Sequence, residues 1–100
     1  MEQIERIKQM ELRLDRASSA VMDLSAALEK YNEAQDDISQ LDAYYTSDEW
    51  KQDFAADEAG ELPPSLRRGV LSEDAIWNVL SDNRELTVRL LEAVTAILKK

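Results

Sequence analysis

The chain has 100 residues, of which 44% are hydrophobic and 33% are charged, and it contains only two Gly and two Pro. So few breakers suit long helices better than sheets, and this length suits a single domain over residues 1–100. The absence of Cys and His excludes disulfides, thiolate and imidazole metal sites, and the usual general base near neutral pH. The net charge of −9 disfavours nucleic acid and anionic lipid as partners.

Most of the negative charge lies in one central segment. Residues 36–61 carry nine acids against one base, Lys51, which gives −8, whereas residues 1–35 sum to −2 and residues 62–100 to +1. The N-terminus is charged from its start and lacks a basic leader with an apolar run. No stretch approaches the ~20 apolar residues that a membrane span needs. We therefore expect a cytoplasmic protein with no membrane partner.

Residues 3–44 are expected to form one long helix, because neither Gly nor Pro occurs among them. Apolar residues recur at alternating spacings of three and four, a heptad-like stripe typical of a helix that packs laterally. The stripe consists of Ile7, Met10, Leu14, Ala17, Val21, Leu24, Leu28, Tyr31, Ile38 and Tyr45, with Gln35 as its polar interruption. Ser18-Ser19 is the place where this helix could kink or break.

A short second helix is expected over 48–58. Thr46 or Ser47 offers an N-cap, and Gly60 can terminate the helix in the left-handed conformation. A Pro-containing linker follows over 59–71, because a residue before proline avoids the helical region.

The third helix is expected over 73–98. Ser72 is its predicted N-cap, and Leu71 can pack on Ile76 as a hydrophobic staple. The whole pattern predicts an all-α fold: an antiparallel helical hairpin of two long helices with coiled-coil-like packing, and with the short helix and the linker at its closed end.

The two long helices differ in length. At 1.5 Å per residue the third helix spans roughly 39 Å, about 20 Å less than the first, so the N-terminal end of the first helix has no intramolecular partner. Its apolar residues are Ile4, Ile7, Met10 and Leu14. A stripe of this size is seldom left in water, so we expect these residues to form a homodimer interface or to bind a helical partner protein. A break at Ser18-Ser19 would instead let the first arm fold back.

The second helix carries a row of carboxylates. Glu49, Asp53 and Asp57 are spaced by four and line one face, where they could hold Mg²⁺ or Ca²⁺. We favour the alternative of a solvated face paired with Arg67 and Arg68, because no loop here has calcium-site spacing. We therefore expect no metal and no cofactor.

Two classes of helical protein fit the sequence poorly. Glu-x-x-Glu pairs, as in all-helical nucleotide pyrophosphohydrolases, occur at 2–5 and 58–61, but one lies at a fraying terminus and the other straddles Gly60. Secreted helical hairpins of this length carry Trp-x-Gly in the bend, whereas Trp50 is followed by Lys51 and Gln52. We therefore expect a protein that is not an enzyme.

Five aromatic residues are expected to meet at the closed end of the hairpin, because four of them flank the second helix and the fifth opens the third. They are Tyr44, Tyr45, Trp50, Phe54 and Trp77. We favour core packing for this cluster, in which ring pairs stabilise the junction. The alternative is a ligand pocket, with Asn83 and Arg84 as its polar groups.

Several segments together suggest a known family: YYTSDEW at 44–50, DEAGELP at 57–63, RGVLSED at 68–74, DNREL at 82–86 and IERI at 4–7. They resemble a family of small bacterial proteins catalogued as domain of unknown function 4298, and the similarity covers nearly the whole chain. The resemblance implies a single bacterial cytoplasmic domain. It carries no established activity, so it assigns no functional residues.

The leading hypothesis is a non-enzymatic interaction module that self-associates or binds a partner helix through the first half of its first helix. The alternative is a carboxylate-based divalent-metal or small-ligand site at the acidic, aromatic closed end.

Overall fold

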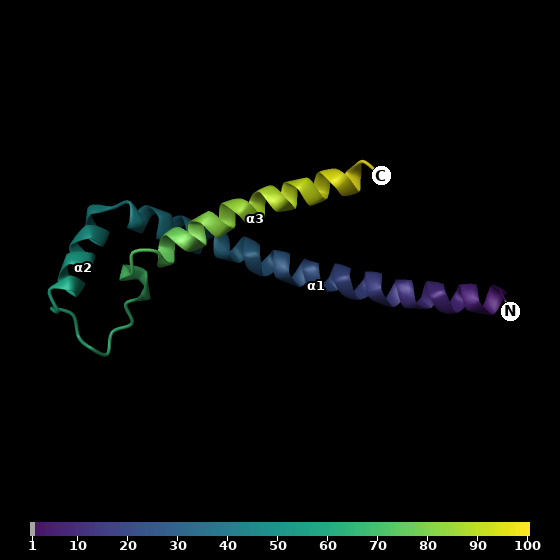
Figure 1. The fold of residues 1–100 in the computed structure, drawn as a ribbon, viewed down its shortest axis with the longest axis horizontal. Coiled ribbons are helices and arrows are strands. Elements are labelled where there is room, and N and C mark those ends of the chain that lie inside the picture. Colours follow the sequence, from purple (N-terminus) through teal and green to yellow (C-terminus); the bar gives the residue numbers. More distant parts are fainter. Residues whose placement is uncertain (1) are drawn as a thin grey trace. The chain divides into compact units, whose positions relative to one another are not determined.

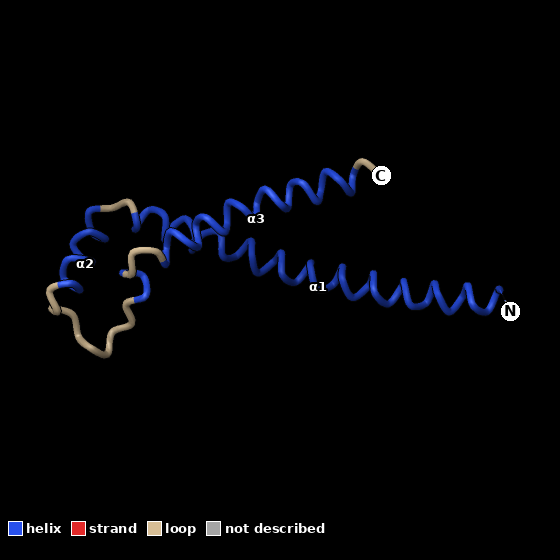
Figure 2. The backbone as a smooth tube through the Cα atoms, viewed as in Figure 1, coloured by secondary structure: helices blue, strands red, loops and turns tan. Residues whose placement is uncertain are grey.

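A computed structural model describes residues 2–100, which form three α-helices and one short 3-10 helix (Figure 1). The elements are α1 (Glu2–Tyr45), α2 (Asp48–Glu58), η1 (Gly69–Leu71) and α3 (Ala75–Leu98). The described residues include no strand, so the predicted all-α class is confirmed. Figure 2 shows the loops in tan, on either side of α2 and η1. The chain divides into two compact units, Met1–Gln35 and Asp36–Lys100.

The first unit consists of the N-terminal part of α1. The helix is continuous through Ser18-Ser19, where a break was possible on sequence grounds. Strong helix formers dominate this part of the chain, and Glu2 and Glu5 in the first turn favour the positive end of the helix dipole. Every described residue up to position 30 is exposed. The first unit therefore carries no core of its own.

The N-terminus of α2 is capped as the sequence indicates. Ser47 has an extended backbone, and its Oγ accepts a hydrogen bond of 3.2 Å from the backbone N–H of Trp50. Asp48 and Glu49 follow in the first turn, where the helix dipole favours negative charge. Of the two candidate caps, Ser47 is the one used.

The C-terminus of α2 ends in a Schellman motif. Gly60 has a φ of +71°, and its N–H donates to the carbonyl of Asp57 at 3.0 Å. The N–H of Glu61 donates to the carbonyl of Ala56, also at 3.0 Å. These two bonds satisfy carbonyls that the helix end would otherwise leave unpaired, so the end at Glu58 follows from the left-handed glycine.

α3 begins at Ala75, two residues later than the start expected at 73. The hydroxyl of Ser72 donates to the carbonyl of Gly69 at 2.9 Å and accepts from the N–H of Ala75 at 3.3 Å. Ser72 therefore links the end of η1 to the first turn of α3, and residues 73 and 74 lie in the bend between them. Asp74 occupies the N-cap position without a side-chain cap bond.

The buried core of the second unit is small. Leu71 and Ile76, the two residues of the predicted staple, are exposed by only 5% and 2%. In the second unit α1 and α3 contribute further residues that are half-buried: Ile38, Leu41, Tyr44, Tyr45, Ala75, Leu80, Asn83 and Leu90. The core therefore sits where η1 meets the start of α3, next to α2 and the C-terminal turns of α1.

Candidate functional site

Four of the predicted aromatic residues gather around α2, in what we call the aromatic junction (Tyr44, Tyr45, Trp50 and Phe54). The ring of Trp50 meets Tyr45 edge to face at 5.1 Å and stacks on Phe54 at 5.2 Å. Its indole N–H donates to the carbonyl of Val70 at 2.9 Å, so one side chain joins α1, α2 and η1. This geometry is that of a packed junction.

Trp77 takes no part in the ring contacts of the aromatic junction and is 58% exposed. Its neighbour Ile76 occupies the inward position at the start of α3. Because successive helical residues are rotated by about 100°, Trp77 then faces away from the core. Of the five residues expected to cluster, Tyr45, Trp50 and Phe54 are in ring contact, Tyr44 reaches α2 through its hydroxyl, and Trp77 is exposed.

Tyr44 is tied to the acidic face of α2. Its hydroxyl donates a 2.5 Å hydrogen bond to Oδ2 of Asp53. Burial raises the pKa of Tyr44 to about 12, with further contributions from this hydrogen bond and from the charges of Asp53 and Glu49. The phenol therefore stays protonated through the neutral range and serves as a hydrogen-bond donor.

The carboxylate row of α2 is partly occupied by other protein groups. Asp53 accepts from Tyr44, and Asp57 accepts from Nη1 of Arg68 at 2.9 Å, which confirms the expected pairing with Arg68. Glu49 lies on the exposed surface. Within residues 2–100 no group of three or more carboxylates is arranged to hold a metal ion.

A cavity of about 380 Å³ lies beside the core of the second unit. Its lining is apolar apart from one cation, and consists of Leu41, Arg67, Gly69, Val70, Ala75, Ile76 and Val79. Neither Asn83 nor Arg84 contributes to it. Sequence reasoning did not find this cavity, because it forms only when Leu41 of α1 meets the linker and α3.

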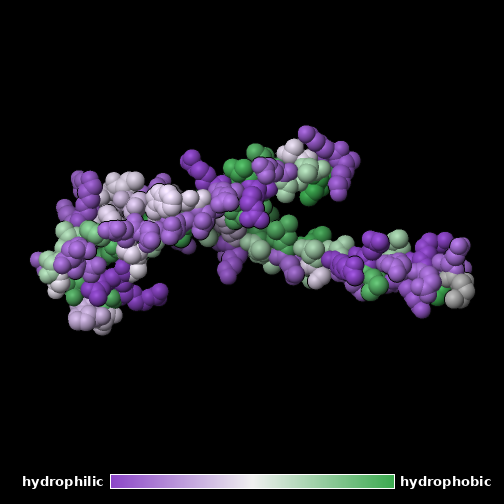
Figure 3. All heavy atoms as spheres, in the orientation of Figure 1, coloured by the Kyte–Doolittle hydropathy of each residue, from purple (hydrophilic) through white to green (hydrophobic). Residues whose placement is uncertain are grey.

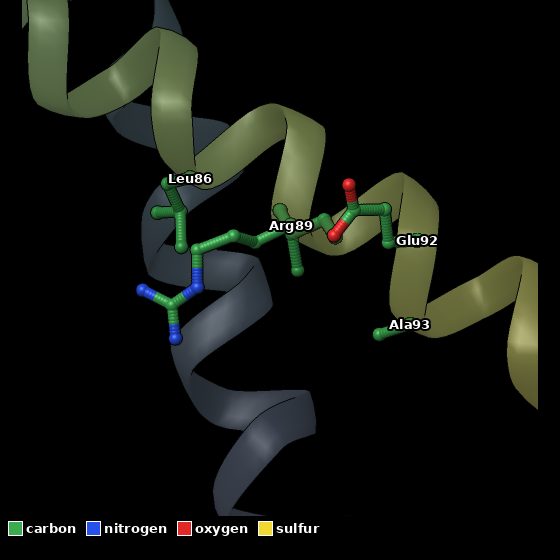
Figure 4. Close-up of a pocket in the computed structure, with 5 residues that line it drawn as sticks. Leu86, Arg89, Glu92 and Ala93 are labelled. Atoms are coloured by element: carbon green, nitrogen blue, oxygen red, sulfur yellow. The ribbon is translucent and has the colours of Figure 1, made fainter.

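A second, shallower depression lies along α3 (Figure 4). Its lining residues all come from that one helix: Leu86, Arg89, Leu90, Glu92 and Ala93. Figure 4 shows the side chains of Arg89 and Glu92 extending along the helix surface. Such a depression is a stretch of helix surface and offers no convergent polar groups that would orient a small ligand.

The four predicted interaction residues lie in a longer exposed row on α1, which we call the N-terminal stripe. It comprises Ile4, Ile7, Met10, Leu14, Ala17, Val21, Leu24 and Leu28. The first four are 55%, 53%, 56% and 61% exposed, and Val21 is 69% exposed. Apolar patches, in green, interrupt the polar surface along this part of α1 in Figure 3. This is the most extended apolar row in the first unit.

No helix within residues 2–100 has an apolar stretch of the length that a bilayer requires. Off the N-terminal stripe, residues 2–30 carry eleven charged side chains, together with the exposed apolar residues Leu12 and Met22.

Comparison with known proteins identifies a family without a known activity. The model of the family described as Domain of unknown function (DUF4298) matches residues 7–93. The match includes α2 and η1 and most of α1 and α3. No curated protein and no solved structure matches the chain.

Proposed function

The chain belongs to the family described as Domain of unknown function (DUF4298), and we propose that it is a non-enzymatic protein–protein interaction module. The N-terminal stripe is its binding surface. A second copy of the chain is the first occupant to test, and a partner helix of another protein is the alternative. The proposed setting is the bacterial cytoplasm, in line with the resemblance to small bacterial proteins.

The exposure of the N-terminal stripe is the observation that carries this proposal. Large apolar side chains repeat at heptad spacing on one face, and about half of each surface is open to water. Burying such a side chain completely contributes about 1.5–3 kcal/mol, so roughly half of that gain remains unrealised at each position. A partner helix with a matching stripe would realise it.

The stability of α1 gives a second argument. Helical segments without tertiary packing are marginal in water, because most of the stability of a helix in a protein comes from its buried face. Residues 2–30 are all exposed. The proposed partner supplies the packing that keeps this segment helical.

The second unit is proposed to hold the helices together as an antiparallel hairpin with coiled-coil-like packing. On α1 the half-buried residues Tyr31, Ala34, Ile38, Leu41 and Tyr45 alternate at spacings of three and four. Leu41 lines the same cavity as Ile76 and Val79 of α3. The hydroxyl of Tyr45 also donates to the carbonyl of Glu73 at 3.4 Å. In this proposal the aromatic junction closes the hairpin and leaves the N-terminal stripe for a partner.

Sedimentation equilibrium at two protein concentrations tests the module. The wild-type chain is expected to sediment at twice its monomer mass of 11.4 kDa at the higher concentration. The double variant Ile7→Lys, Leu14→Lys should sediment as a monomer, because it would bury four unpaired ammonium groups in the apolar interface of the pair.

The double variant Leu12→Lys, Met22→Lys is the matched control, because both residues are exposed on the same helix but lie off the stripe. It should still form the dimer. A wild-type chain that stays at 11.4 kDa at every concentration would contradict self-association. Equal loss of the dimer in both double variants would contradict the assignment of the stripe.

A further inference from the structure

The charges that accompany the N-terminal stripe are balanced, whereas those that follow it are not. Between residues 2 and 30, six acids are interspersed with five bases: Glu2, Glu5, Glu11, Asp15, Asp23 and Glu29 with Arg6, Lys8, Arg13, Arg16 and Lys30. Residues 36–61 carry nine acids and only Lys51 as a base. Two copies of the first segment therefore present mixed charges to each other, whereas two copies of the acidic segment repel.

We infer that the N-terminal stripe is covered by a second copy of this chain that runs antiparallel to the first, an inference that rests on the function proposed above. In a parallel, in-register pair each stripe residue meets its own counterpart. Asp36 and Asp37 follow Leu28 on α1 by about two turns. A parallel pair would therefore bring the two acidic segments, residues 36–61 of each copy, to the same end of the pair, whereas an antiparallel pair sends them to opposite ends.

One antiparallel register uses only residues that the structure leaves exposed. It pairs Ile7 with Leu24 of the second copy, Met10 with its Val21, and Leu14 with its Ala17. Because the pair has two-fold symmetry, each contact occurs twice, which gives six apolar layers. Tyr31, which is half-buried, takes no part in the interface in this register.

The flanking charges favour the same register. It places Arg13 beside Ala20 of the second copy and Glu11 beside its Ser18. If the two helices shifted by one heptad towards a shorter overlap, Arg13 would lie beside Arg13 of the second copy. Glu11 would likewise lie beside Glu11 of the second copy. Those like-charge pairs act against the shorter overlap.

Spin-label distances measured in the assembled dimer test the orientation. The chain contains no Cys, so Glu5→Cys and Ser19→Cys each introduce a single labelling site on the outer face of α1. In the proposed register the labels are offset along the axis by about 32 Å at position 5 and by about 10 Å at position 19. Adding Leu14→Lys to each labelled chain is the control, and it should abolish both dipolar signals.

A long distance at position 5 together with a short distance at position 19 supports the antiparallel pair. Short and equal distances at both positions would overturn the antiparallel orientation while leaving self-association intact. No dipolar signal at either position, in a chain that sediments as a monomer, would overturn the orientation and the proposed self-association together.

Discussion

Trp50 connects three elements of the second unit, α1, α2 and η1. Its ring contacts Tyr45 and Phe54, and its N–H reaches the carbonyl of Val70 twenty positions along the chain. In a chain built mainly of helices, few contacts join residues that are this far apart in the sequence. The stability of the junction should therefore depend strongly on this one residue.

We expect Trp50→Ala to lower the free energy of unfolding by about 3 kcal/mol, because it removes two ring contacts and leaves a cavity. Trp50→Phe keeps a ring but removes the indole donor, and should cost about 1 kcal/mol. Trp77→Ala is the matched control, since Trp77 is 58% exposed, and it should cost well under ~1 kcal/mol. Urea unfolding followed by circular dichroism measures all three, and equal losses for Trp50→Ala and Trp77→Ala would argue against the junction.

Because the pKa of Tyr44 is raised, we expect the free energy of unfolding to fall at high pH. Its folded pKa, about 12, lies above the ordinary value of 10.0. The folded state therefore holds this proton more tightly than the unfolded chain does. The stability that it contributes is complete below pH 10 and is lost as the pH rises through about 12.

Measured between these pH values, the free energy of unfolding should fall more steeply in the wild type than in Tyr44→Phe, which has no group to titrate. Asp53→Asn should move the pKa of Tyr44 towards its ordinary value, because it removes the negative charge beside the phenol. Ultraviolet titration of tyrosinate follows the shift. Parallel stability curves for the wild type and Tyr44→Phe would show that the phenol is not perturbed.

At the residue scale, the sequence predicted which aromatic residues would gather at α2, but it did not predict the groups that they contact. A spacing of four places Trp50 and Phe54 on one face of α2. The hydrogen bond from Trp50 to the carbonyl of Val70 could not be predicted, because a backbone acceptor has no sequence signature. The exposure of Trp77 was also missed. Ile76 and Trp77 are adjacent, and only the packing decides which of them faces inward.

At the scale of elements, Gly60 ends α2 for a backbone reason alone. It has a φ of +71°, and a Cβ placed on it would meet no atom within 4 Å. Gly60→Ala should therefore destabilise the chain by about 1 kcal/mol through left-handed strain.

Gly69→Ala is the control for Gly60→Ala. An added Cβ there also meets nothing within 4 Å, and Gly60 is the only residue with positive φ in the described chain. Gly69→Ala should be neutral or slightly stabilising, because it restricts the unfolded chain. Thermal unfolding compares the two variants, and an equal effect at both glycines would show that the left-handed turn does not terminate the helix.

The helices were the most predictable elements, for identifiable reasons. Ser47 and Gly60 are residues with a direct backbone role, so the ends of α2 agree with the sequence. The start of α3 was misplaced by two residues because Ser72 bonds to both Gly69 and Ala75 and so extends the bend. A capping serine in the sequence does not reveal which of its two bonds sets the boundary.

At the scale of the whole molecule, the long apolar row of α1 was visible in the sequence and is exposed in the structure. What covers it could not be predicted from spacing alone, because a heptad stripe fits a partner of either orientation. The acidic residues beyond Leu28 provide the distinction. They favour a second copy that runs antiparallel to the first.

Hydrogen exchange of the backbone amides of residues 7–28, at protein concentrations above and below dimer dissociation, tests the central claim most directly. If a second copy covers the N-terminal stripe, protection of these amides should rise with concentration, while that of α2 stays constant. Protection of residues 7–28 that is the same at every concentration, or absent throughout, would contradict the account.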